Sequence, residues 1–314
     1  MKRAVIVGSG GQDGTILHEQ LKNRGYAIIG IAREVVTTTE IEYPRTVIDI
    51  ADFGQVRALL RDFQPHEVYY LAAFHQSSQD SQLDEIELFQ KSYRVNVEYL
   101  VHFLEAIRKH ATKTRLFYAA SSHVFGDGTG ECQDEETPLN PVCVYGMTKA
   151  AGLLACRYYR DKYAVFATTG ILYNHESRYR SPNFVSKKII KSAVDIKNGQ
   201  TEKLVLGNLK AEIDWGFAPD YAEAMHSLLE IDVAGEYIIA TGQKHTVLDF
   251  VVTAFSLLGL NWEKYVIEDV ELIQKPSFLR IGNPQKLTAA TGWKPKTSFE
   301  QMIQILLRDE GALV

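Results

Sequence analysis

The sequence is poor in cysteine and has no long apolar run. Its 314 residues include 3 cysteines, at Cys132, Cys143 and Cys156, and none of them forms a Cys-x-x-Cys pair. This small, odd number predicts reduced structural thiols in a reducing compartment. No apolar run reaches the roughly 18 residues that span a membrane, and residues 1–3 lead directly into an apolar strand instead of a signal peptide. We therefore expect a cytoplasmic protein that does not enter a membrane.

Signals for metal and nucleic-acid binding are also missing. The 9 histidines include no His-Glu-x-x-His or other metal-ligand spacing, so the sequence predicts no metal site. A net charge of -5 argues against general binding to nucleic acid. One group of basic residues either holds a diphosphate or forms a solvated helix face: Arg178, Arg180, Lys187, Lys188 and Lys191.

Strand-like and helical segments alternate along the chain. Apolar runs typical of buried strands lie at residues 3–8, 26–31, 46–50, 67–71, 115–120 and 164–172. Amphipathic stretches typical of helices lie at residues 13–23, 53–63, 88–110 and 144–163. This alternation predicts an α/β fold of the Rossmann type, with a doubly wound parallel sheet.

The length and the composition, with 46% hydrophobic residues, are sufficient for a large core that is divided between a domain and a smaller lobe. We expect a dinucleotide-binding domain at residues 1–173 and a smaller α/β substrate lobe formed mainly by residues 174–314, with the chain able to cross between them. The last third predicts a strand at residues 236–240, a helix at 247–258, and a closing helix that Ser298 and Gln301 begin as a capping box.

A glycine-rich turn follows the first strand. Gly8, Gly11 and Gly14 stand between the apolar run and the first amphipathic helix. Glycines there allow a tight turn, the approach of a pyrophosphate to bare backbone, and close packing of the helix on the strand. The amides and the dipole at the helix N-terminus attract an anion. The turn predicts a dinucleotide site, with an ordinary structural loop as the alternative.

Two side chains suited to proton transfer follow later in the chain. Tyr145 and Lys149 are four residues apart, so a phenol and an ammonium share one helix face, and the cation is expected to lower the phenol pKa. Such a phenol exchanges a proton with a sugar hydroxyl while a nicotinamide exchanges the hydride. Ser121 ends a strand-like run, at the sheet edge where doubly wound folds bind ligands. These residues indicate a nicotinamide enzyme, although 16 tyrosines also offer such a pair by chance.

Longer strings carry a family resemblance. With the glycine turn, Ser121, Tyr145 and Lys149, the chain resembles extended short-chain dehydrogenases/reductases and is similar to GDP-mannose 4,6-dehydratases over nearly its whole length. The strings that carry the resemblance are Gly-Gln-Asp-Gly at 11–14, Tyr-Gly-Met-Thr-Lys at 145–149, Tyr-Asn-His-Glu-Ser at 173–177, Asn-Phe-Val at 183–185, Leu-Gly-Asn-Leu at 206–209, Asp-Trp-Gly at 214–216, Asp-Tyr-Ala-Glu-Ala-Met at 220–225 and Gly-Trp-Lys-Pro at 292–295.

The resemblance implies a lyase reaction on a nucleotide-linked hexose. In that family carbon 4 is oxidised, carbon 5 loses a proton, the carbon 6 hydroxyl leaves as water, and the hydride returns to carbon 6. By position, Tyr145 is implied as the base of the oxidation, Lys149 as the residue that holds the nicotinamide ribose, and Ser121 as the residue that orients the sugar oxygen.

The chain departs from the family at the second acid/base. The family has a glutamate two positions after the serine or threonine, as the carbon 5 base, whereas this chain has His123. An imidazole, with an ordinary pKa of about 6.5, is able to relay a proton from carbon 5 to the leaving hydroxyl. In the alternative, His123 only binds substrate, and the enzyme reduces or epimerises a 4-keto nucleotide sugar. A dinucleotide-binding regulator without turnover is a further alternative, which the intact Ser121, Tyr145 and Lys149 disfavour.

The glycine turn and the resemblance together imply the residues of the cofactor site. They are Gly8, Gly11, Gln12, Asp13, Gly14, Arg33, Asp49, Ile50, Leu71, Ala72, Ala73, Tyr145 and Lys149. Arg33 follows the second strand, where a basic residue favours NADP and an acidic one favours NAD. Glu34 beside it weakens that preference, so we expect NADP with NAD as the alternative. Asp49 either contacts adenine or caps the helix that begins near Phe53.

The resemblance also implies a substrate site and an oligomer. The substrate-binding residues are Asn174, Asn183, Lys188, Leu206, Gly207 and Arg280. Ile213 stands where the family has an arginine, and Glu212 replaces another basic residue. Either Lys187, Lys188 and Arg280 supply the missing charge, or the nucleotide sugar differs from the family norm. We expect a GDP-linked sugar, and a homodimer or homotetramer that pairs the helices at 88–110 and 144–163.

Overall fold

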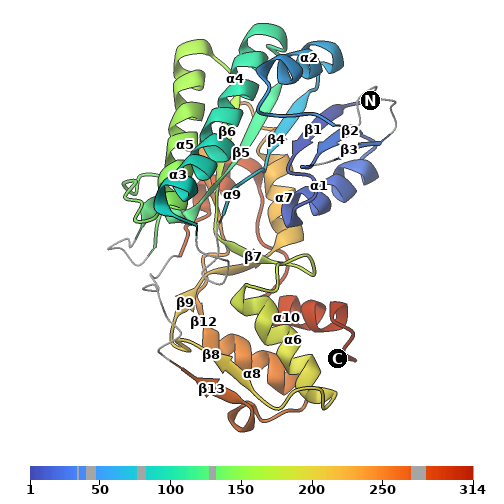
Figure 1. Cartoon of the computed structure of the whole chain (residues 1–314), viewed down its shortest axis with the longest axis vertical. Helices are drawn as coiled ribbons and strands as arrows, with labels where there is room; N and C mark the ends of the chain where they lie inside the picture. The colour runs from blue at the N-terminus through green and yellow to red at the C-terminus, as the bar shows by residue number, and fades with distance from the viewer. Residues whose placement is uncertain (34, 40–46, 76–82, 127–131, 270–280, 314) are drawn as a thin grey trace.

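The computed structural model describes residues 1–33, 35–39, 47–75, 83–126, 132–269 and 281–313. Two residues of predicted interest, Glu34 and Arg280, lie outside these ranges. The chain forms a larger upper part around a sheet and a smaller lower part (Figure 1).

A seven-stranded sheet, ordered β11-β6-β5-β4-β1-β2-β3, forms the centre of the upper part (Figure 1). Its strands are β1 (Arg3–Val7), β2 (Ala27–Ile31), β3 (Val36–Thr39), β4 (Glu67–Tyr70), β5 (Arg115–Ser121), β6 (Ala167–Leu172) and β11 (Glu236–Ile239). Strands β2, β4 and β6 are buried along their whole length because helices cover both faces of the sheet. The order extends outward from β1 in both directions, which confirms the predicted doubly wound fold.

The third strand differs from the prediction. Strand β3 pairs antiparallel with β2, while the other pairs of the large sheet are parallel. The predicted strand at 46–50 is wrong, because the described residues 47–50 form no strand. There the Asp49 side chain accepts a hydrogen bond from the Ala51 N–H at 2.9 Å. The backbone carbonyl oxygen of Asp49 accepts another from the Asp52 N–H at 3.1 Å. Bonds of a side chain to nearby backbone compete with strand pairing.

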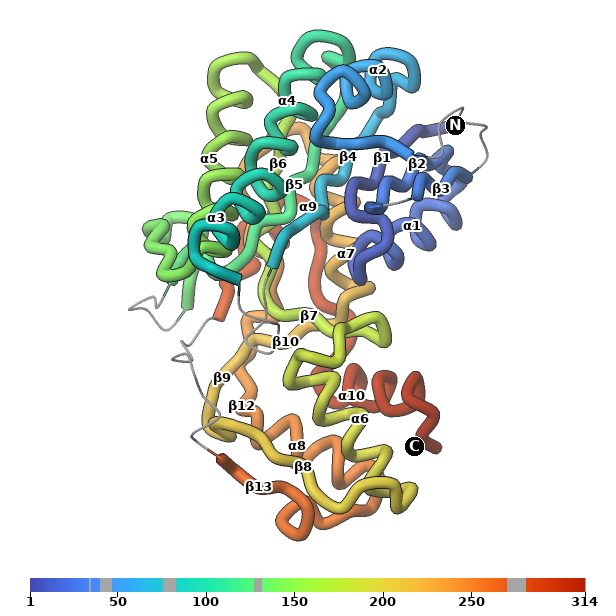
Figure 2. The backbone as a smooth tube through the Cα atoms, in the orientation of Figure 1, coloured from blue at the N-terminus to red at the C-terminus, as the bar shows by residue number. Residues whose placement is uncertain are grey.

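Helices cover both faces of the large sheet. α2 (Phe53–Phe63), α4 (Tyr99–His110) and α5 (Val144–Tyr163) pack on one face, and α1 (Gln12–Asn23) and α7 (Ala218–Ser227) lie side by side on the other (Figures 1 and 2). The predicted bounds of α2 and α5 are confirmed. The predicted helix at 88–110 is instead α3 (Glu85–Tyr93), a wider π-type turn (Arg94–Glu98) and α4.

The lower part has its own core. α6 (Val185–Lys197), α8 (Val247–Leu257) and α10 (Phe299–Asp309) pack beside the pair β8 (Leu204–Leu206) and β13 (Val266–Glu268). Ser298 begins α10 as a capping box, which confirms that prediction. The remaining pairs are β7 (Asn174–Glu176) with β10 (Trp215–Phe217), and β9 (Glu212–Ile213) with β12 (His245–Thr246). Figure 1 shows β7 between the two parts.

The chain crosses between the two parts more than once. After α6 and β8, it returns to the upper part as α7 and β11. It returns there again, after α8 and β13, as α9 (Gln285–Thr291), and Leu287 and Trp293 join the core of α1 and α7. Helix α10 lies again in the lower part (Figure 2). Residues after 173 therefore contribute to both cores, and the boundary at residue 173 stays a prediction. Within the described ranges, no helix combines the length and apolarity needed to cross a membrane.

The turn from β1 to α1 needs glycine at two positions. Gly8 has φ +95°, and a Cβ atom there would lie 2.8 Å from the Ala72 nitrogen. A Cβ atom on Gly14 would lie 2.2 Å from the Gly8 carbonyl oxygen, so α1 packs directly on the turn. Gly11 precedes α1 and provides no side-chain cap, which leaves the first amides of the helix without an intrahelical partner.

The first turn of α1 also ties the two parts together. His175 of β7 contacts Asp13 Oδ1 through Nε2 at 2.9 Å, and its Nδ1 lies 2.6 Å from the Tyr173 carbonyl oxygen. Both ring nitrogens face acceptors, an arrangement that favours the protonated, doubly donating form of the buried ring. Burial opposes both charges, but the pairing raises the pKa of His175 above 6.5 and lowers that of Asp13 below 3.8. Gln12 donates to the His175 carbonyl oxygen at 3.0 Å and accepts from the Ser177 hydroxyl at 2.9 Å.

Replacing Gly14 by alanine is expected to destabilise the protein and weaken dinucleotide binding, because the new Cβ atom must displace the Gly8 backbone. Overpacking of this kind costs about 1–3 kcal/mol. Gly10→Ala is the matched control, since its Cβ atom would lie 3.4 Å from that of Ala32. Thermal unfolding and NADPH titration compare the two variants, and equal behaviour of both contradicts the prediction.

The Asp13–His175 pair predicts a pH-dependent stability. Breaking a buried ion pair costs about 3 kcal/mol, so His175→Gln is expected to lower the free energy of unfolding by that amount where both groups are charged. The contribution of His175 is complete below its ordinary pKa of 6.5 and is lost as the pH rises through its raised pKa. That of Asp13 is present above 3.8 and is lost as the pH falls through its lowered pKa. Urea unfolding of the wild type and His175→Gln across the pH range measures the difference in their free energies of unfolding. A difference that does not shrink at alkaline pH contradicts the prediction.

Candidate active site

Three elements bring the predicted catalytic side chains to the carboxyl edge of the large sheet. Ser121 is the last residue of β5, and His123 follows in the short helical turn Ser122–Phe125. Tyr145 and Lys149 lie one turn apart in α5. A Cβ atom on Gly146 would lie 2.5 Å from the His123 carbonyl oxygen, so glycine permits α5 to pack closely on this turn. The four predicted residues therefore lie in one group.

Burial controls the charges of Tyr145 and Lys149. It raises the pKa of the Tyr145 phenol to about 12, against the opposing effect of a hydrogen bond with Ser121. The Lys149 ammonium lies 5.7 Å from the Tyr145 ring centroid and donates to the Ala119 carbonyl oxygen at 2.7 Å. Burial lowers the pKa of Lys149 to about 7, so its charge is only partly present at neutral pH. The expectation of a lowered phenol pKa is wrong here, because burial outweighs the hydrogen bond of Ser121.

His123 is positioned by its neighbours on β5 and α5. Its ring lies edge-on to Tyr145, with centroids 5.6 Å apart. Its Nδ1 contacts Cys143 Sγ at 3.7 Å, and its backbone N–H donates to Ser121 Oγ at 3.4 Å. Cys143 caps α5, where its sulfur accepts from the Gly146 N–H at 3.4 Å. Because Nδ1 of His123 contacts the Cys143 sulfur, Nε2 is the ring nitrogen suited to proton exchange with a ligand.

A second imidazole contacts the same phenol. His75, in the segment after β4, packs edge-on against Tyr145 with centroids 4.7 Å apart. It also stacks on Phe184 at 6.1 Å, and the Arg180 guanidinium lies 3.7 Å from the Phe184 centroid. The sequence placed residues 74–76 where the nicotinamide side of the pocket begins, but it assigned no role to His75. The available signal was its place just after Ala73, at the carboxyl edge of the predicted sheet.

The glycine turn and the segment after β4 form one surface. Strands β1 and β4 are paired, and the Gly8 backbone approaches Ala72 closely. The predicted cofactor residues of that segment are Leu71, Ala72 and Ala73. Gln12 and Asp13, also predicted there, direct their side chains to β7 and Ser177 instead, and only their backbone stays at the turn.

The other predicted cofactor residues follow β2 and precede α2. Arg33 is exposed just after β2. Asp52 caps α2, so the alternative that Asp49 caps this helix is wrong. Asp49 bonds the Ala51 N–H instead, and the Ile50 carbonyl oxygen lies 3.0 Å from His102 Nδ1.

The predicted substrate residues lie where the lower part begins. Asn174 is on β7, Asn183 just precedes α6, Leu206 is the last residue of β8, and Gly207 follows it. Lys188 joins two of these elements, because its Nζ on α6 donates to a β8 carbonyl oxygen at 2.8 Å. These residues surround the start of α6, while Lys188 is partly engaged by the protein itself.

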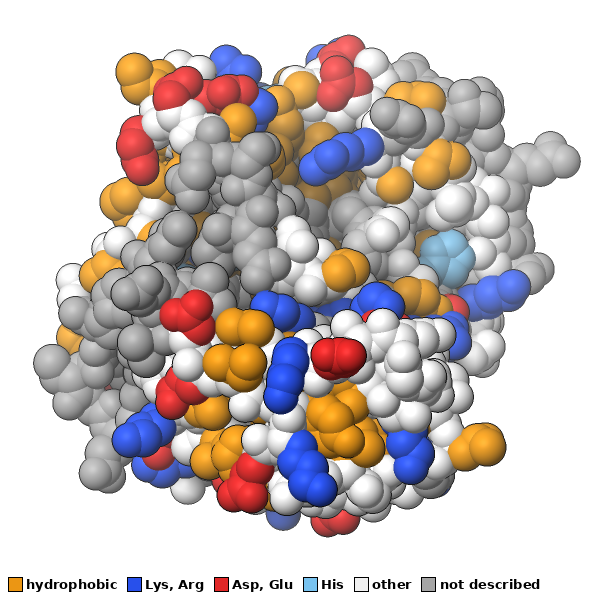
Figure 3. Space-filling model, turned by 60° about the horizontal axis from the view of Figure 1, so that its bottom comes forward, with side chains coloured by type: hydrophobic (Ala, Val, Ile, Leu, Met, Phe, Trp, Pro, Cys, Tyr) orange, Lys and Arg blue, Asp and Glu red, His pale blue; other side chains and the backbone are white. Residues whose placement is uncertain are grey.

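Acidic partners neutralise part of the basic group. Lys187 pairs with Glu310, and Lys191 pairs with the carboxylate four residues later at 3.1 Å. Glu212, which replaces a basic residue of the family, pairs with Lys244 at 2.9 Å. Figure 3 shows basic side chains spread over this face of the molecule, with acidic ones among them. The basic residues and Glu212 therefore have partners within the protein, and their roles toward a diphosphate stay a prediction.

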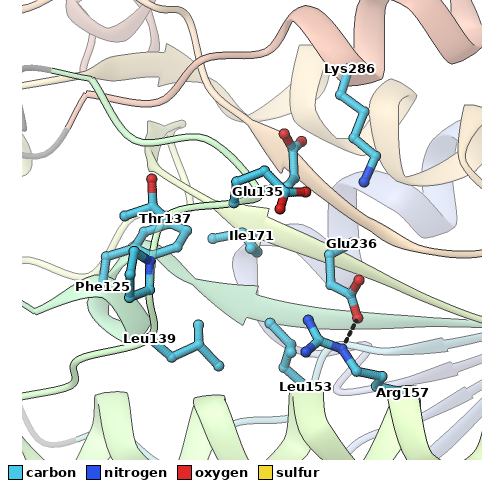
Figure 4. A pocket seen from close by; sticks show the side chains of 11 residues that line it. Phe125, Glu135, Thr137, Leu139, Leu153, Arg157, Ile171, Glu236 and Lys286 are labelled. Atoms are coloured by element: carbon cyan, nitrogen blue, oxygen red, sulfur yellow. Dashed lines mark hydrogen bonds and ion pairs between the residues drawn. The ribbon is translucent and has the colours of Figure 1, made fainter.

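A hollow of about 290 Å³ lies beside edge strand β11 (Figure 4). Glu135, Arg157, Glu236 and Lys286 contribute its charged walls, and Arg157 pairs with Glu236 at 3.3 Å. None of the four predicted catalytic residues lines this hollow. It is separate from the group at Tyr145.

The group at Tyr145 offers acid/base chemistry on a hydroxylated ligand. A hydroxyl, a phenol, an ammonium and two imidazoles converge at the sheet edge, beside a helix N-terminus suited to phosphate. The phenol and the hydroxyl suit a sugar oxygen, and the imidazoles transfer protons near neutral pH.

The structure is similar to solved structures over nearly its whole length. RMD from Pseudomonas aeruginosa, complexed with NADPH, has a TM-score of 0.82 at 19% identity and covers 99% of both chains. The dTDP-glucose 4,6-dehydratase from Bacillus anthracis, in complex with NAD, has a TM-score of 0.80 at 19% identity, over 98% of this chain and 96% of that one. At these identities the likeness shows the fold.

Sequence relatives carry the family assignment. GDP-mannose 4,6 dehydratase 2 of Arabidopsis thaliana is 35% identical over 98% of this chain and 87% of its own length. The GDP-mannose 4,6-dehydratase of Sinorhizobium fredii is 32% identical over 98% and 96%. The family profile for GDP-mannose 4,6 dehydratase matches residues 5–306. This confirms the resemblance carried by the short strings, and the chain belongs to the GDP-mannose 4,6-dehydratase family.

Proposed function

We propose that this protein dehydrates GDP-mannose or a closely related GDP-sugar to a 4-keto-6-deoxy product, with NADP as its cofactor. The observation that carries the proposal is the group formed by Ser121, His123, Tyr145 and Lys149 at the sheet edge of a chain in this family.

The residues at the glycine turn fit a dinucleotide. Gly8 and Gly14 leave no side chain over the N-terminus of α1, whose amides suit a pyrophosphate. Arg33, exposed after β2, suits the 2'-phosphate of NADP, and Asp49 and Ile50 border the adenosine side. Held by these residues, NADP would supply the hydride acceptor for carbon 4 and the hydride donor for carbon 6.

Tyr145 takes the proton of the carbon 4 hydroxyl. Burial raises its pKa to about 12, so the phenolate needs the hydrogen bond of Ser121 and the nearby charge of Lys149 to form. Lys149, anchored on the Ala119 carbonyl oxygen, is also placed to hold a ribose hydroxyl. These three side chains divide orientation, proton transfer and charge stabilisation among them.

His123 carries the proton of carbon 5. Oxidation at carbon 4 makes the neighbouring carbon 5 hydrogen acidic, so a base of moderate strength is sufficient. Imidazole accepts and returns a proton near neutral pH, which suits it to the position of the family glutamate. The contact of Nδ1 with Cys143 at 3.7 Å directs Nε2 to this task.

The start of α6 is the proposed diphosphate side of the substrate. This helix begins without a side-chain cap, so its first amides suit an anion. Lys188 adds charge in its first turn, and Asn174, Asn183 and the β8 end at Leu206 and Gly207 lie around it. The proposal includes Arg280, outside the described residues, as further charge.

Histidine at the position of the family glutamate favours one second candidate. If His123 only binds the substrate, the same group reduces or epimerises a 4-keto nucleotide sugar, because Ser121, Tyr145 and Lys149 suffice for hydride transfer.

The first test is incubation of the protein and its co-purified cofactor with GDP-mannose in deuterated water, read by mass spectrometry. We expect a product that is lighter by one water and heavier by one deuterium, because the proton held by His123 exchanges with solvent. His123→Ala is expected to slow product formation about hundredfold or more, and His110→Gln, at the end of α4, is the control. Absence of water loss, with NADPH-dependent consumption of a 4-keto sugar, contradicts dehydration and supports the second candidate.

The proposal also includes a homodimer or a larger homo-oligomer. Helices α3 and α5 are in contact, and together they expose apolar side chains at helical spacing: Ile86, Phe89, Tyr93, Met147, Leu154 and Tyr158. The same helix pair of a second copy would cover this surface, which is defined here as the α3–α5 stripe.

Charge introduced into the α3–α5 stripe is expected to dissociate the oligomer. Leu154→Asp with Tyr158→Asp places two carboxylates where we propose helix contacts, so the variant should have the mass of one 35.4 kDa chain in light scattering. Val233→Asp, at a residue 70% exposed in the turn before β11, is the matched control and should keep the wild-type mass. A monomeric wild type contradicts the prediction.

A further inference from the structure

His75 is held beside the catalytic phenol through its neighbour in the chain. The Asn96 side chain, in the wider turn between α3 and α4, accepts from the Phe74 N–H at 3.0 Å and donates to the Phe74 carbonyl oxygen at 3.3 Å. Asn96 is fully buried and also donates to Thr148 of α5 at 2.9 Å. The backbone before His75 is thus tied to the helix that carries Tyr145.

His75 also faces the part of the molecule proposed to bind the nucleotide sugar. Its ring stacks on Phe184, just before α6, with the ring planes inclined by 25°. Arg180 covers Phe184 and pairs with the buried Glu176 at 3.1 Å. A hexose that extends from the start of α6 to Tyr145 therefore passes His75.

The two imidazoles at Tyr145 differ in their surroundings. His123 is half-buried, and its Nδ1 contacts Cys143, which suits a base that keeps one orientation while it takes and returns a proton. His75 is exposed, so solvent reaches its ring. The two side chains follow the adjacent strands β4 and β5, so they stand on the same edge of the sheet.

The proposed elimination needs an acid as well as a base. Breaking the carbon 5–hydrogen bond delivers a proton to the base, and breaking the carbon 6–oxygen bond sends its electron pair to the leaving oxygen. Hydroxide leaves poorly unless that oxygen is protonated. The Tyr145 phenol is a weak acid in its buried position, and Lys149 donates to a backbone carbonyl. Neither suits this step as well as an imidazolium does.

We propose that His75 is the general acid that protonates the carbon 6 oxygen while His123 is the base at carbon 5; the assignment rests on the proposed dehydratase function. As the proton passes from the His75 imidazolium to the oxygen, the carbon 6–oxygen bond breaks and water leaves. His75 is then neutral and regains a proton from solvent. Tyr145 releases to solvent the proton that it took from the carbon 4 hydroxyl, so the protons balance. The proton on His123 returns to carbon 5 when the hydride enters carbon 6.

The test compares GDP-mannose with its 6-deoxy-6-fluoro analogue, because fluoride leaves without the proton that hydroxide requires. We expect His75→Gln to lower kcat for water loss about hundredfold while KM stays nearly constant. Fluoride loss should fall by less than about threefold in the same variant, since that step needs no general acid. Deuterium exchange at carbon 5 should persist in His75→Gln, whereas His123→Gln should lose exchange and both eliminations.

A control variant and the comparison of leaving groups separate acid catalysis from support of the fold. His110→Gln, at the end of α4, should change neither elimination. Equal loss of both eliminations in His75→Gln means a structural role and overturns the assignment, as does unchanged water loss. A wild-type protein that eliminates neither water nor fluoride overturns the dehydratase function itself, and the assignment fails with it.

Discussion

The ion pair between Asp13 and His175 is the contact on which the arrangement of the site depends. Asp13 belongs to the helix that follows the glycine turn, and His175 belongs to β7, where the chain enters the lower part. A few residues beyond β7 lie Arg180 and Phe184, which stack toward His75. One buried pair therefore sets how the proposed cofactor turn faces the proposed substrate elements.

Burial then decides which side chains carry charge. Tyr145 and Lys149 lie deep enough that burial works against both the phenolate and the ammonium. His75 is exposed and His123 is half-buried, and both rings pack edge-on with Tyr145. A buried ammonium beside a phenol and two imidazoles suits a reaction that combines oxidation with loss of water.

Local pattern predicted much of the fold. The bounds of α2 and α5 follow from amphipathic spacing, and Ser298 with Gln301 marks the start of α10. The same reasoning failed at 88–110, where one wider turn interrupts the helix. That turn carries Asn96 into the interior, where it bonds Thr148 and the Phe74 backbone. A regular apolar period does not reveal such a turn, because its cause is a contact with residues far away in the sequence.

The sequence by itself determined the fold class, the glycine turn and the grouping of Ser121, Tyr145 and Lys149, because these depend on strand order, backbone sterics and spacing within one helix. Only the tertiary structure decided the partners of Gln12 and Asp13, the direction of the Tyr145 pKa shift and the place of His75. Each of these depends on burial or on contacts between segments distant along the chain, such as β7 with α1 and α6 with the segment after β4.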